Sequence, residues 1–158
     1  MEKIFAAGKG ARIINVSSLG YISGGKEAYN PWLAYAQSKT ANILFASSLA
    51  RRLKSRGVLA FALNPGYVTQ EMFAEGYAMT LKSLDGAKMP PLVPKTLAEG
   101  SLTTIYAALD PTLTGHSGAF LSDCAIYTDL RDHAVGKEKE EKLWLLSEEL
   151  VGERFNHR

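Results

Sequence analysis

The sequence predicts an α/β fold built on a parallel sheet, and the order of three segments indicates it. Residues 12–17, within "ARIINVSS", form a β-branched run after a Gly-Lys-Gly break, which is typical of a buried strand. A long helical segment follows, and a second apolar run, "VLAFALNPG", ends at Pro65 and Gly66. Because a strand, a helix and a strand in this order require a crossover connection, the two strands are expected to be parallel.

The helical segment between these strands, residues 31–56, has clear start and stop signals. Asn30 is a preferred N-cap residue, Pro31 suits the first helical position, basic residues fill the last turn and Gly57 follows the end. Its apolar positions repeat along one stripe and are expected to face the sheet. They are Leu33, Ala36, Ile43, Phe45, Leu49, Ala50 and Leu53.

Two more helices and a third strand are predicted after a stretch of weak pattern over residues 67–95, which is expected to be a mobile or substrate-facing loop. Thr96 and Glu99 have the spacing of a capping box and begin a helix over residues 97–109, which Pro111 stops. The run "SGAFLSD" predicts the third strand.

The C-terminal stretch "KEKEEKLWLLSEELVG" predicts an amphipathic helix. Leu143, Leu146 and Leu150 are expected on its buried stripe. Its many charged residues are expected to form a solvated face.

Size and composition favour one intracellular domain. The chain has 158 residues, 46% of them hydrophobic, and a formal charge of +2, which does not suggest a nucleic-acid surface. A single cysteine excludes an internal disulfide, and no Cys or His cluster has metal-ligand spacing. Neither a signal peptide nor a membrane-spanning run is recognisable. We expect a cytoplasmic protein with a small-molecule substrate.

Tyr35 and Lys39, in "YAQSK", are the candidate chemical pair. Four positions apart on a helix, they lie on one face. A positive charge about 4 Å from a phenolate stabilises it by roughly 4 kcal/mol at an effective dielectric constant near 20, which would make the tyrosine a competent acid and base. Taken alone, however, such a pair is ordinary on a helix surface.

Three motifs in order resemble the short-chain dehydrogenase/reductase family: "IINVSS" at 13–18, "YAQSK" at 35–39 and "NPGYVT" at 64–69. The segment "AYAQSKTANILFASSLARRLKSRGV" and the ending "KLWLLSEELVG" are similar to its retinol-dehydrogenase-like branch, including fungal relatives. The resemblance implies a Rossmann-like, doubly wound parallel sheet and an NAD(P)-dependent interconversion of an alcohol and a carbonyl. The resemblance to this branch slightly favours NADP over NAD as the cofactor, and it favours an apolar substrate.

The resemblance also implies roles for individual residues. Ser18 would hydrogen-bond the substrate oxygen, Tyr35 would transfer the proton, and Lys39 would assist Tyr35 and hold the cofactor ribose.

Residues after the second strand would contact the cofactor. Pro65 and Gly66 would let the backbone approach the nicotinamide, and Val68 would present backbone to its carboxamide. Thr69 lies one position before the family's usual threonine, which is Gln70 here. In the resemblance, this threonine contacts the cofactor pyrophosphate.

The family's opening strand, glycine-rich turn and helix are not recognisable in this sequence. The motif "GKG" at 8–10 precedes a strand instead of following one. Residues 1–158 are therefore expected to form a single partial domain, the C-terminal catalytic half of the usual fold without its dinucleotide-binding half. The strand at 12–17 would then be an edge strand.

Three alternatives stay open. In the first, the chain is a non-catalytic association module that forms a homo-oligomer or pairs with full-length relatives through the 31–56 helix. In the second, the chain is a serine hydrolase that uses Ser17 or Ser18 with His116 and Asp123, although no Gly-x-Ser-x-Gly elbow is present. The third concerns four side chains before Tyr35, which either line a substrate pocket or simply pack. These are Tyr21, Ile22, Tyr29 and Trp32.

Overall fold

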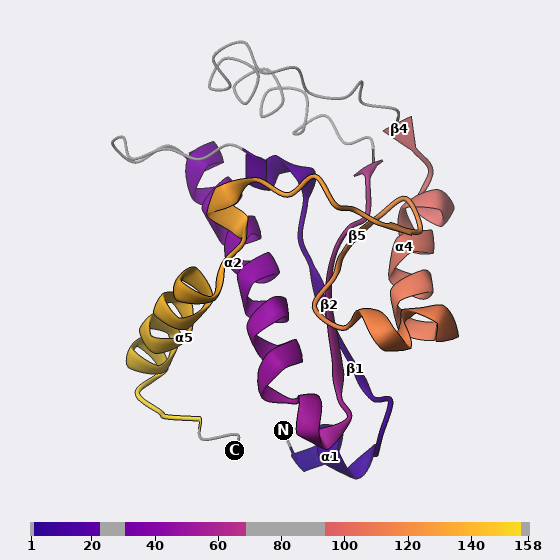
Figure 1. Ribbon diagram of the computed structural model, residues 1–158. Coiled ribbons are helices and arrows are strands. Elements are labelled where there is room, and N and C mark those ends of the chain that lie inside the picture. The colour runs from indigo at the N-terminus through magenta and orange to yellow at the C-terminus, as the bar shows by residue number, and fades with distance from the viewer. Residues whose placement is uncertain (1, 23–30, 69–93, 156–158) are drawn as a thin grey trace.

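The computed structural model describes residues 2–22, 31–68 and 94–155 (Figure 1). The helices are α1 (Glu2–Ala6), α2 (Pro31–Arg52), α4 (Leu97–Leu109) and α5 (Lys137–Val151). The strands are β1 (Arg12–Val16), β2 (Leu59–Asn64), β3 (Tyr67–Val68), β4 (Pro94–Lys95), β5 (Phe120–Ser122) and β6 (Ala125–Ile126). Short 3-10 helices span Leu19–Ile22, Lys54–Arg56, Pro111–His116 and Asp132–Ala134.

The main sheet has the strand order β1-β2-β5-β6. β1 and β2 run parallel, with Val16 opposite Leu63, and β2 and β5 also run parallel. These pairings confirm the predicted parallel sheet. β1 lies at one edge of this sheet, as expected from the sequence.

The antiparallel strand β6 was not predicted. β5 and β6 are joined by a two-residue turn in which Asp123 and Cys124 both have positive φ values, 50° and 55°. Such hairpin turns usually contain glycine. An Asp-Cys pair therefore gave no hairpin signal in the sequence.

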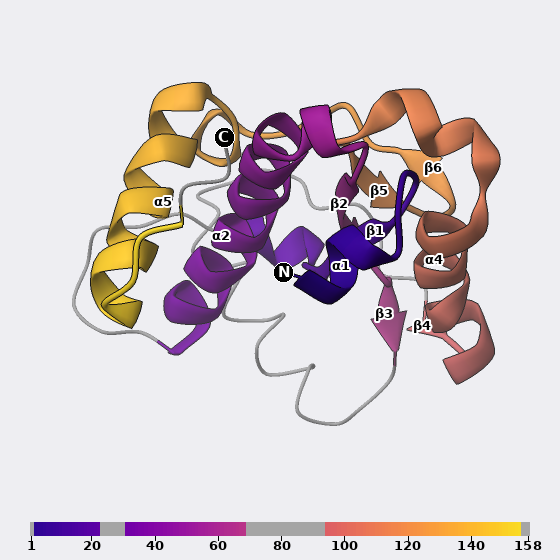
Figure 2. The same cartoon turned by 90° about the horizontal axis from the view of Figure 1, so that it is seen from below.

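Helices cover both faces of the sheet (Figures 1 and 2). α2 packs on one face and α5 lies on its outer side, whereas α4 packs against β1, β2 and β5 from the opposite face. This is the layered arrangement expected of a Rossmann-like fold. No helix in the described part of the chain is long and apolar enough to cross a bilayer.

α2 has the predicted start and nearly the predicted end. It runs from Pro31 to Arg52, a 3-10 turn continues to Arg56, and Gly57 closes the segment in the left-handed conformation with φ 68°. The apolar stripe predicted for this helix is buried or half-buried. Alanines on this stripe let the helix approach the strands closely.

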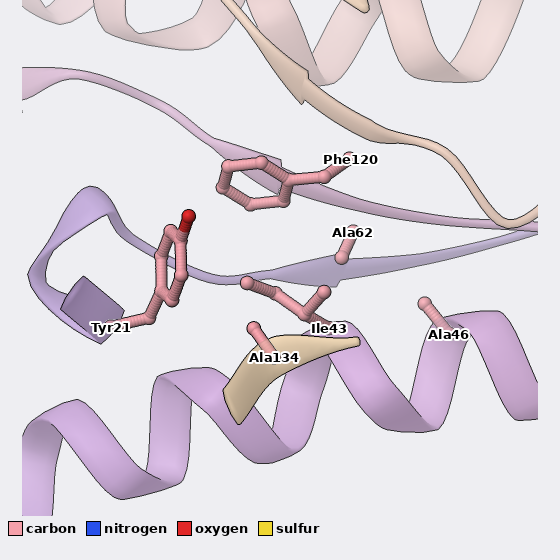
Figure 3. Close-up of a cluster of buried hydrophobic side chains, with 6 residues drawn as sticks. All are labelled: Tyr21, Ile43, Ala46, Ala62, Phe120 and Ala134. Atoms are coloured by element: carbon pink, nitrogen blue, oxygen red, sulfur yellow. The ribbon is translucent and has the colours of Figure 1, made fainter. Parts of the chain in front are cut away.

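One part of the core joins α2 to the strands and to the segment before α5 (Figure 3). The Tyr21 and Phe120 rings meet edge to face, with centroids 5.7 Å apart. This geometry suits the quadrupoles of two aromatic rings. The buried members of the cluster are Tyr21, Ile43, Ala46, Ala62, Phe120 and Ala134.

α4 has the predicted bounds and the predicted capping box. The Glu99 backbone N–H donates to Thr96 Oγ1 at 3.2 Å, and the Thr96 N–H donates to the Glu99 carboxylate at 2.8 Å. The helix ends at Leu109, one residue before the Asp110–Pro111 step. Local capping chemistry was sufficient to fix both ends.

The predicted buried stripe of α5 was wrong for two of its three leucines. Leu146 and Leu150 are exposed and Leu143 is half-buried, whereas Glu140 and Trp144 are buried. The Trp144 ring stacks on Phe45 of α2, with centroids 5.7 Å apart and an interplanar angle of 12°.

Charge pairing also decides which side of α5 faces α2. Glu140 and Glu141 pair with Arg51, at 2.6 and 2.9 Å, and Glu141 also pairs with Arg52 at 2.5 Å. The expectation that the charges of α5 only form a solvated face is therefore corrected. The basic end of α2 attracts acidic residues of α5 to the interface.

The stretch expected to be a loop contains a short parallel ladder that the sequence did not indicate. β3 pairs with β4, with Tyr67 opposite Pro94 and Val68 opposite Lys95. Proline has no N–H to donate and is confined to the margins of sheets, so Pro94 argued against a strand here. Residues 69–93, which connect the two strands, lie outside the described residues, and the short helix α1 was also not predicted.

Candidate functional site

The predicted site residues gather at the carboxyl ends of the parallel strands. β1 leads into Ser17 and Ser18, β2 leads into Pro65 and Gly66, and β5 leads into Asp123. The carboxyl ends of parallel strands lie at one edge of a sheet, and in open α/β sheets ligands bind outside this edge.

The two serines after β1 have different environments. Ser17 is buried, its N–H donates to the Leu63 carbonyl at 2.6 Å, and its hydroxyl donates to the Lys39 carbonyl at 2.7 Å. Ser17 therefore joins β1 to β2 and to α2. Ser18 is half-buried, and its hydroxyl lies beside Gly20, as does the Tyr35 ring.

Ser18 and Tyr35 both lie beside Gly20. A Cβ atom placed on Gly20 would lie 3.2 Å from Cε1 of Tyr35 and 3.3 Å from Oγ of Ser18. The Ser18 hydroxyl also accepts the Gly20 N–H at 3.0 Å. The turn after β1 thus brings the serine next to the ring, and it does so at a position without a side chain.

Lys39 lies against both Tyr35 and the end of β1. Its Nζ is 5.3 Å from the centroid of the Tyr35 ring and donates to the Val16 carbonyl at 3.2 Å. Asn42, one turn farther along α2, donates to the same carbonyl at 3.1 Å. Asn42 was not singled out in the sequence, although its position three residues after Lys39 places it on the same helix face.

Gly66 faces a lysine side chain. Gly66 has φ +91°, and a Cβ atom placed on it would lie 2.6 Å from Cδ and 2.7 Å from Cε of Lys95. The Lys95 ammonium pairs with Asp123. The space of the missing side chain at Gly66 holds the Lys95 chain in this structure, and the contact of Gly66 with a nicotinamide stays a prediction.

Asn64 links the three strand ends, and the sequence analysis missed it. It is buried, its Oδ1 accepts the Leu19 N–H at 3.3 Å, and its Nδ2 donates to Ser122 Oγ at 3.1 Å. A buried amide usually has such partners. Its signal in the sequence was a polar residue at the end of an otherwise apolar strand.

Tyr21 belongs to the core. Its side chain is fully buried, its hydroxyl donates to the Asp129 carbonyl at 3.4 Å, and it accepts the Arg131 N–H at 3.3 Å. Burial raises the pKa of its phenol. Of the two interpretations of the residues before Tyr35, packing applies to Tyr21.

Several predicted positions fall outside the described residues. They are Thr69, Gln70, Tyr29 and the side chains of Ile22, Trp32 and Val68. The Val68 backbone is described and pairs with Lys95 in the β3-β4 ladder.

The "GKG" motif lies at the amino ends of the parallel strands, whereas the site lies at their carboxyl ends. It precedes β1, and the Gly10 N–H donates to the Gly57 carbonyl, just before β2, at 2.8 Å. The contacts also give no support to the hydrolase alternative. The Ser17 hydroxyl donates to the Lys39 carbonyl, and the Asp123 carboxylate pairs with Lys95. No group of three metal-ligating side chains occurs in the ranges that the structure describes.

Comparison with known proteins identifies the family. The family model described as short chain dehydrogenase matches residues 1–80. The chain belongs to the short-chain dehydrogenase family. The resemblance noted from the three motifs is thereby confirmed at the level of the family.

Curated relatives come from animals and fungi. Retinol dehydrogenase 12 of Bos taurus is 35% identical over 153 residues, covering 92% of this chain and 47% of the relative. Polyprenol dehydrogenase of Mus musculus is 36% identical over 159 residues, with coverages of 93% and 46%. Short-chain dehydrogenase/reductase prx1 of Penicillium roqueforti is 30% identical over 155 residues, with coverages of 87% and 46%. The chain spans about half the length of these relatives.

Solved structures show the same fold. A protein of unassigned function from Mycobacterium paratuberculosis superposes with a TM-score of 0.62 at 26% identity, covering 91% of this chain and 51% of that one. A Beutenbergia cavernae protein, assigned as an NAD(P)-dependent gluconate 5-dehydrogenase and solved with NADP at low occupancy, gives a TM-score of 0.53 at 25% identity, with coverages of 77% and 47%.

The short-chain dehydrogenase family implies a nicotinamide cofactor, and part of this site fits one. Ser18, Tyr35 and Lys39 lie together at the carboxyl ends of the parallel strands, and the Ser18 hydroxyl and the Tyr35 ring lie so close to Gly20 that a Cβ atom there would be 3.3 and 3.2 Å from them. These residues suit the nicotinamide and ribose end of the cofactor. In the described ranges, no glycine-rich turn connects a strand to a helix at this edge to hold the pyrophosphate.

Proposed function

We propose that this chain carries the substrate and proton-transfer side of an NAD(P)-dependent interconversion of an alcohol and a carbonyl. The observation that supports it is the placement of the Ser18 hydroxyl and the Tyr35 ring against the same glycine, Gly20, with the Lys39 ammonium 5.3 Å from the centre of that ring. NADP is slightly preferred to NAD by the branch resemblance, and a neighbouring structure was solved with NADP.

Tyr35 and Ser18 have different roles at the substrate oxygen. In the reducing direction, the Tyr35 hydroxyl donates its proton to the substrate oxygen, and the Ser18 hydroxyl donates a hydrogen bond to the same oxygen. In the oxidising direction, Tyr35 accepts the proton from the alcohol. The bound nicotinamide supplies or accepts the hydride.

Lys39 has two functions in this proposal. Its charge near the Tyr35 ring stabilises the phenolate that forms when the proton leaves. Its hydrogen bond to the Val16 carbonyl fixes the ammonium at the end of β1, which is the position from which it can hold ribose hydroxyls. The relatives support an apolar substrate, since their names specify retinol and polyprenol as the alcohols oxidised.

The decisive experiment compares turnover of the wild-type chain and Tyr35→Phe, using an apolar aldehyde with NADPH and, separately, NADH. We expect the variant to lose about 10²- to 10⁴-fold in rate, the usual contribution of general acid catalysis. Tyr106→Phe is the matched control, since Tyr106 is a half-buried tyrosine in α4, away from Ser18 and Lys39. Full turnover by Tyr35→Phe would refute the assigned chemistry.

Calorimetric titration with NADPH and NADH separates a missing cofactor site from a wrong mechanism. Saturable binding that weakens in Lys39→Met supports the proposed placement of the ribose. If the folded chain binds neither cofactor at millimolar concentration, it has no dehydrogenase activity of its own, and the association-module alternative gains support.

A further inference from the structure

Tyr21 lies in the turn after β1, and its backbone carbonyl is buried. Residues Leu19–Ile22 form a 3-10 helix, and the last carbonyls of a helix have no partner within the helix itself. Tyr21 is fully buried, and a buried carbonyl without a hydrogen bond is unfavourable. The donor that satisfies this carbonyl therefore matters for the position of the turn.

His133 is the donor, although it lies 112 positions from Tyr21 in the sequence. Its Nε2 atom is 2.8 Å from the Tyr21 carbonyl oxygen. Because a carbonyl oxygen only accepts, the proton of the imidazole is assigned to Nε2. Histidine side chains near the end of a helix commonly bond its last carbonyls in this way. The two rings are also neighbours, with centroids 5.8 Å apart.

Thr40 of α2 does not replace His133 as the donor. The Thr40 hydroxyl is 3.4 Å from the Tyr21 carbonyl oxygen but only 3.0 Å from the carbonyl oxygen of Ala36, one turn earlier in its own helix. A hydroxyl has one proton to donate, and the shorter distance favours Ala36. Within the described part of the chain, this leaves the imidazole as the donor to Tyr21.

The stretch that contains His133 also holds the Tyr21 side chain. The Tyr21 hydroxyl accepts the Arg131 N–H at 3.3 Å and donates to the Asp129 carbonyl at 3.4 Å. Ala134 belongs to the same buried cluster as Tyr21 (Figure 3). The imidazole therefore approaches the carbonyl from a segment that is itself fixed against Tyr21.

Tyr21 in turn fixes residues of the candidate site. Its N–H donates to the Ser18 carbonyl at 3.2 Å, and the Gly20 N–H donates to the Ser18 hydroxyl at 3.0 Å. The Tyr35 ring lies beside Gly20. A displacement of Tyr21 would therefore move the serine hydroxyl relative to the Tyr35 ring.

We propose that His133 is a positioning residue of this site. It acts through Tyr21: its imidazole N–H holds the Tyr21 carbonyl and thereby keeps the Ser18 hydroxyl in place relative to Tyr35. The inference rests on the proposed function, in which both side chains act on one substrate oxygen. Because such steps depend on placement within an ångström, loss of the imidazole should slow the chemical step more than it weakens substrate binding.

Amide hydrogen exchange followed by NMR tests the placement of the turn without any turnover. In His133→Ala, the Gly20 and Tyr21 N–H groups should exchange about tenfold faster, because the turn opens more often. The Gly118 N–H, which donates to the Ala60 carbonyl at 2.7 Å at the amino ends of the strands, is the internal control and should keep its rate. Unchanged exchange at Gly20 and Tyr21 overturns the proposal. An equal rise at Gly118 also overturns it, since that would show general destabilisation.

Two amide variants separate a hydrogen-bond role from loss of packing. The side-chain amide of Gln places an N–H near the position of imidazole Nε2, whereas that of Asn reaches only to the position of Nδ1. His133→Gln should therefore keep the wild-type exchange rate at Tyr21 and a kcat near the wild-type value. His133→Ala and His133→Asn should each lower kcat by about tenfold with little change in KM. Equal kcat values in the Gln and Asn variants, or a loss that appears only in KM, overturn the proposal.

His116→Ala is the matched control. His116 is an exposed histidine in the 3-10 helix Pro111–His116, before β5 and away from Tyr21, so its replacement should change neither the exchange at Tyr21 nor kcat. A wild-type chain without turnover that still shows the expected exchange pattern would refute the proposed function and support the placement of the turn by His133. The two failures are therefore distinguishable.

Discussion

Glu140 of α5 and Arg51 of α2 form an ion pair of 2.6 Å between residues 89 positions apart. Glu140 is nearly buried, at 7% exposure, and its second oxygen accepts the Ser47 hydroxyl at 2.8 Å. A buried carboxylate requires such partners. This contact fixes α5 on α2 and turns its leucines outward.

Replacement of Glu140 should therefore destabilise the protein. We expect Glu140→Ala to lower the free energy of unfolding by about 1–3 kcal/mol, since the Ser47 hydroxyl and the Arg51 guanidinium each lose a partner. Arg51 is partly exposed and keeps Glu141, so the lower part of this range is expected. The measurement is urea denaturation.

Glu138→Ala is the control for this prediction. Glu138 pairs with Lys142 on the exposed side of α5, and exposed pairs contribute about 1 kcal/mol or less. Equal losses in the two variants would show that the Glu140 contact has no special role.

Gly20 should be required for activity and dispensable for stability. In Gly20→Ala, the new methyl group would push apart Tyr35 and Ser18, whose nearest atoms would lie at 3.2 and 3.3 Å. We expect turnover to fall by about tenfold or more, because positioning to within an ångström governs such steps. Steady-state rates and thermal melting give the two readouts.

Gly115→Ala provides the comparison, because a Cβ atom there meets nothing within 4 Å. It should leave both readouts near their wild-type values. If Gly20→Ala keeps wild-type turnover, the arrangement of Ser18 and Tyr35 beside Gly20 is not part of the site.

Asn64 and Ser122 should be energetically coupled. Asn64→Ala removes the acceptor of the Leu19 N–H and the donor to Ser122, with an expected loss of about 1–3 kcal/mol in the free energy of unfolding. A double-mutant cycle with Ser122→Ala should show a coupling of about 0.5 kcal/mol or more. Strict additivity would mean that the hydrogen bond between them contributes nothing.

Ionisation of Glu148 should make the stability of the protein depend on pH in the acidic range. The Phe155 N–H, at 2.8 Å, and the Trp144 indole N–H, at 2.9 Å, hold its pKa below the ordinary value, with smaller help from Arg154 and Arg52. A group whose pKa is lower in the folded state stabilises the fold above its unfolded pKa, about 4.3, and this contribution is lost as pH falls through the folded value.

Glu148→Gln tests this dependence, with urea midpoints measured from pH 7 to pH 3. The variant should be less stable than the wild type at pH 7, and the difference should shrink toward pH 3. A difference that stays constant over this range would exclude ionisation of Glu148 as its cause.

Much of the fold could be predicted from the sequence because its signals are local. The capping box of Thr96 and Glu99 fixed the start of α4, Pro31 and Gly57 bounded the α2 segment, and β-branched runs marked β1 and β2. The pairing of Tyr35 with Lys39 follows from helix geometry alone. Where the sequence failed, at β6 and at the β3-β4 ladder, the residues lacked the usual turn and strand chemistry.

The sequence by itself determined where the three longer helices and the three parallel strands of the main sheet form and which residues share one face of a helix, since these depend on neighbours within a few positions. Only the tertiary structure decided that Ser18 and Tyr35 both lie beside Gly20, that Lys95 covers Gly66, and which faces of α4 and α5 point outward. The physical reason is that these outcomes depend on burial and charge pairing between residues far apart in the chain. Helical periodicity predicts an apolar face, but it does not reveal whether that face is covered by the protein's own sheet or is left exposed.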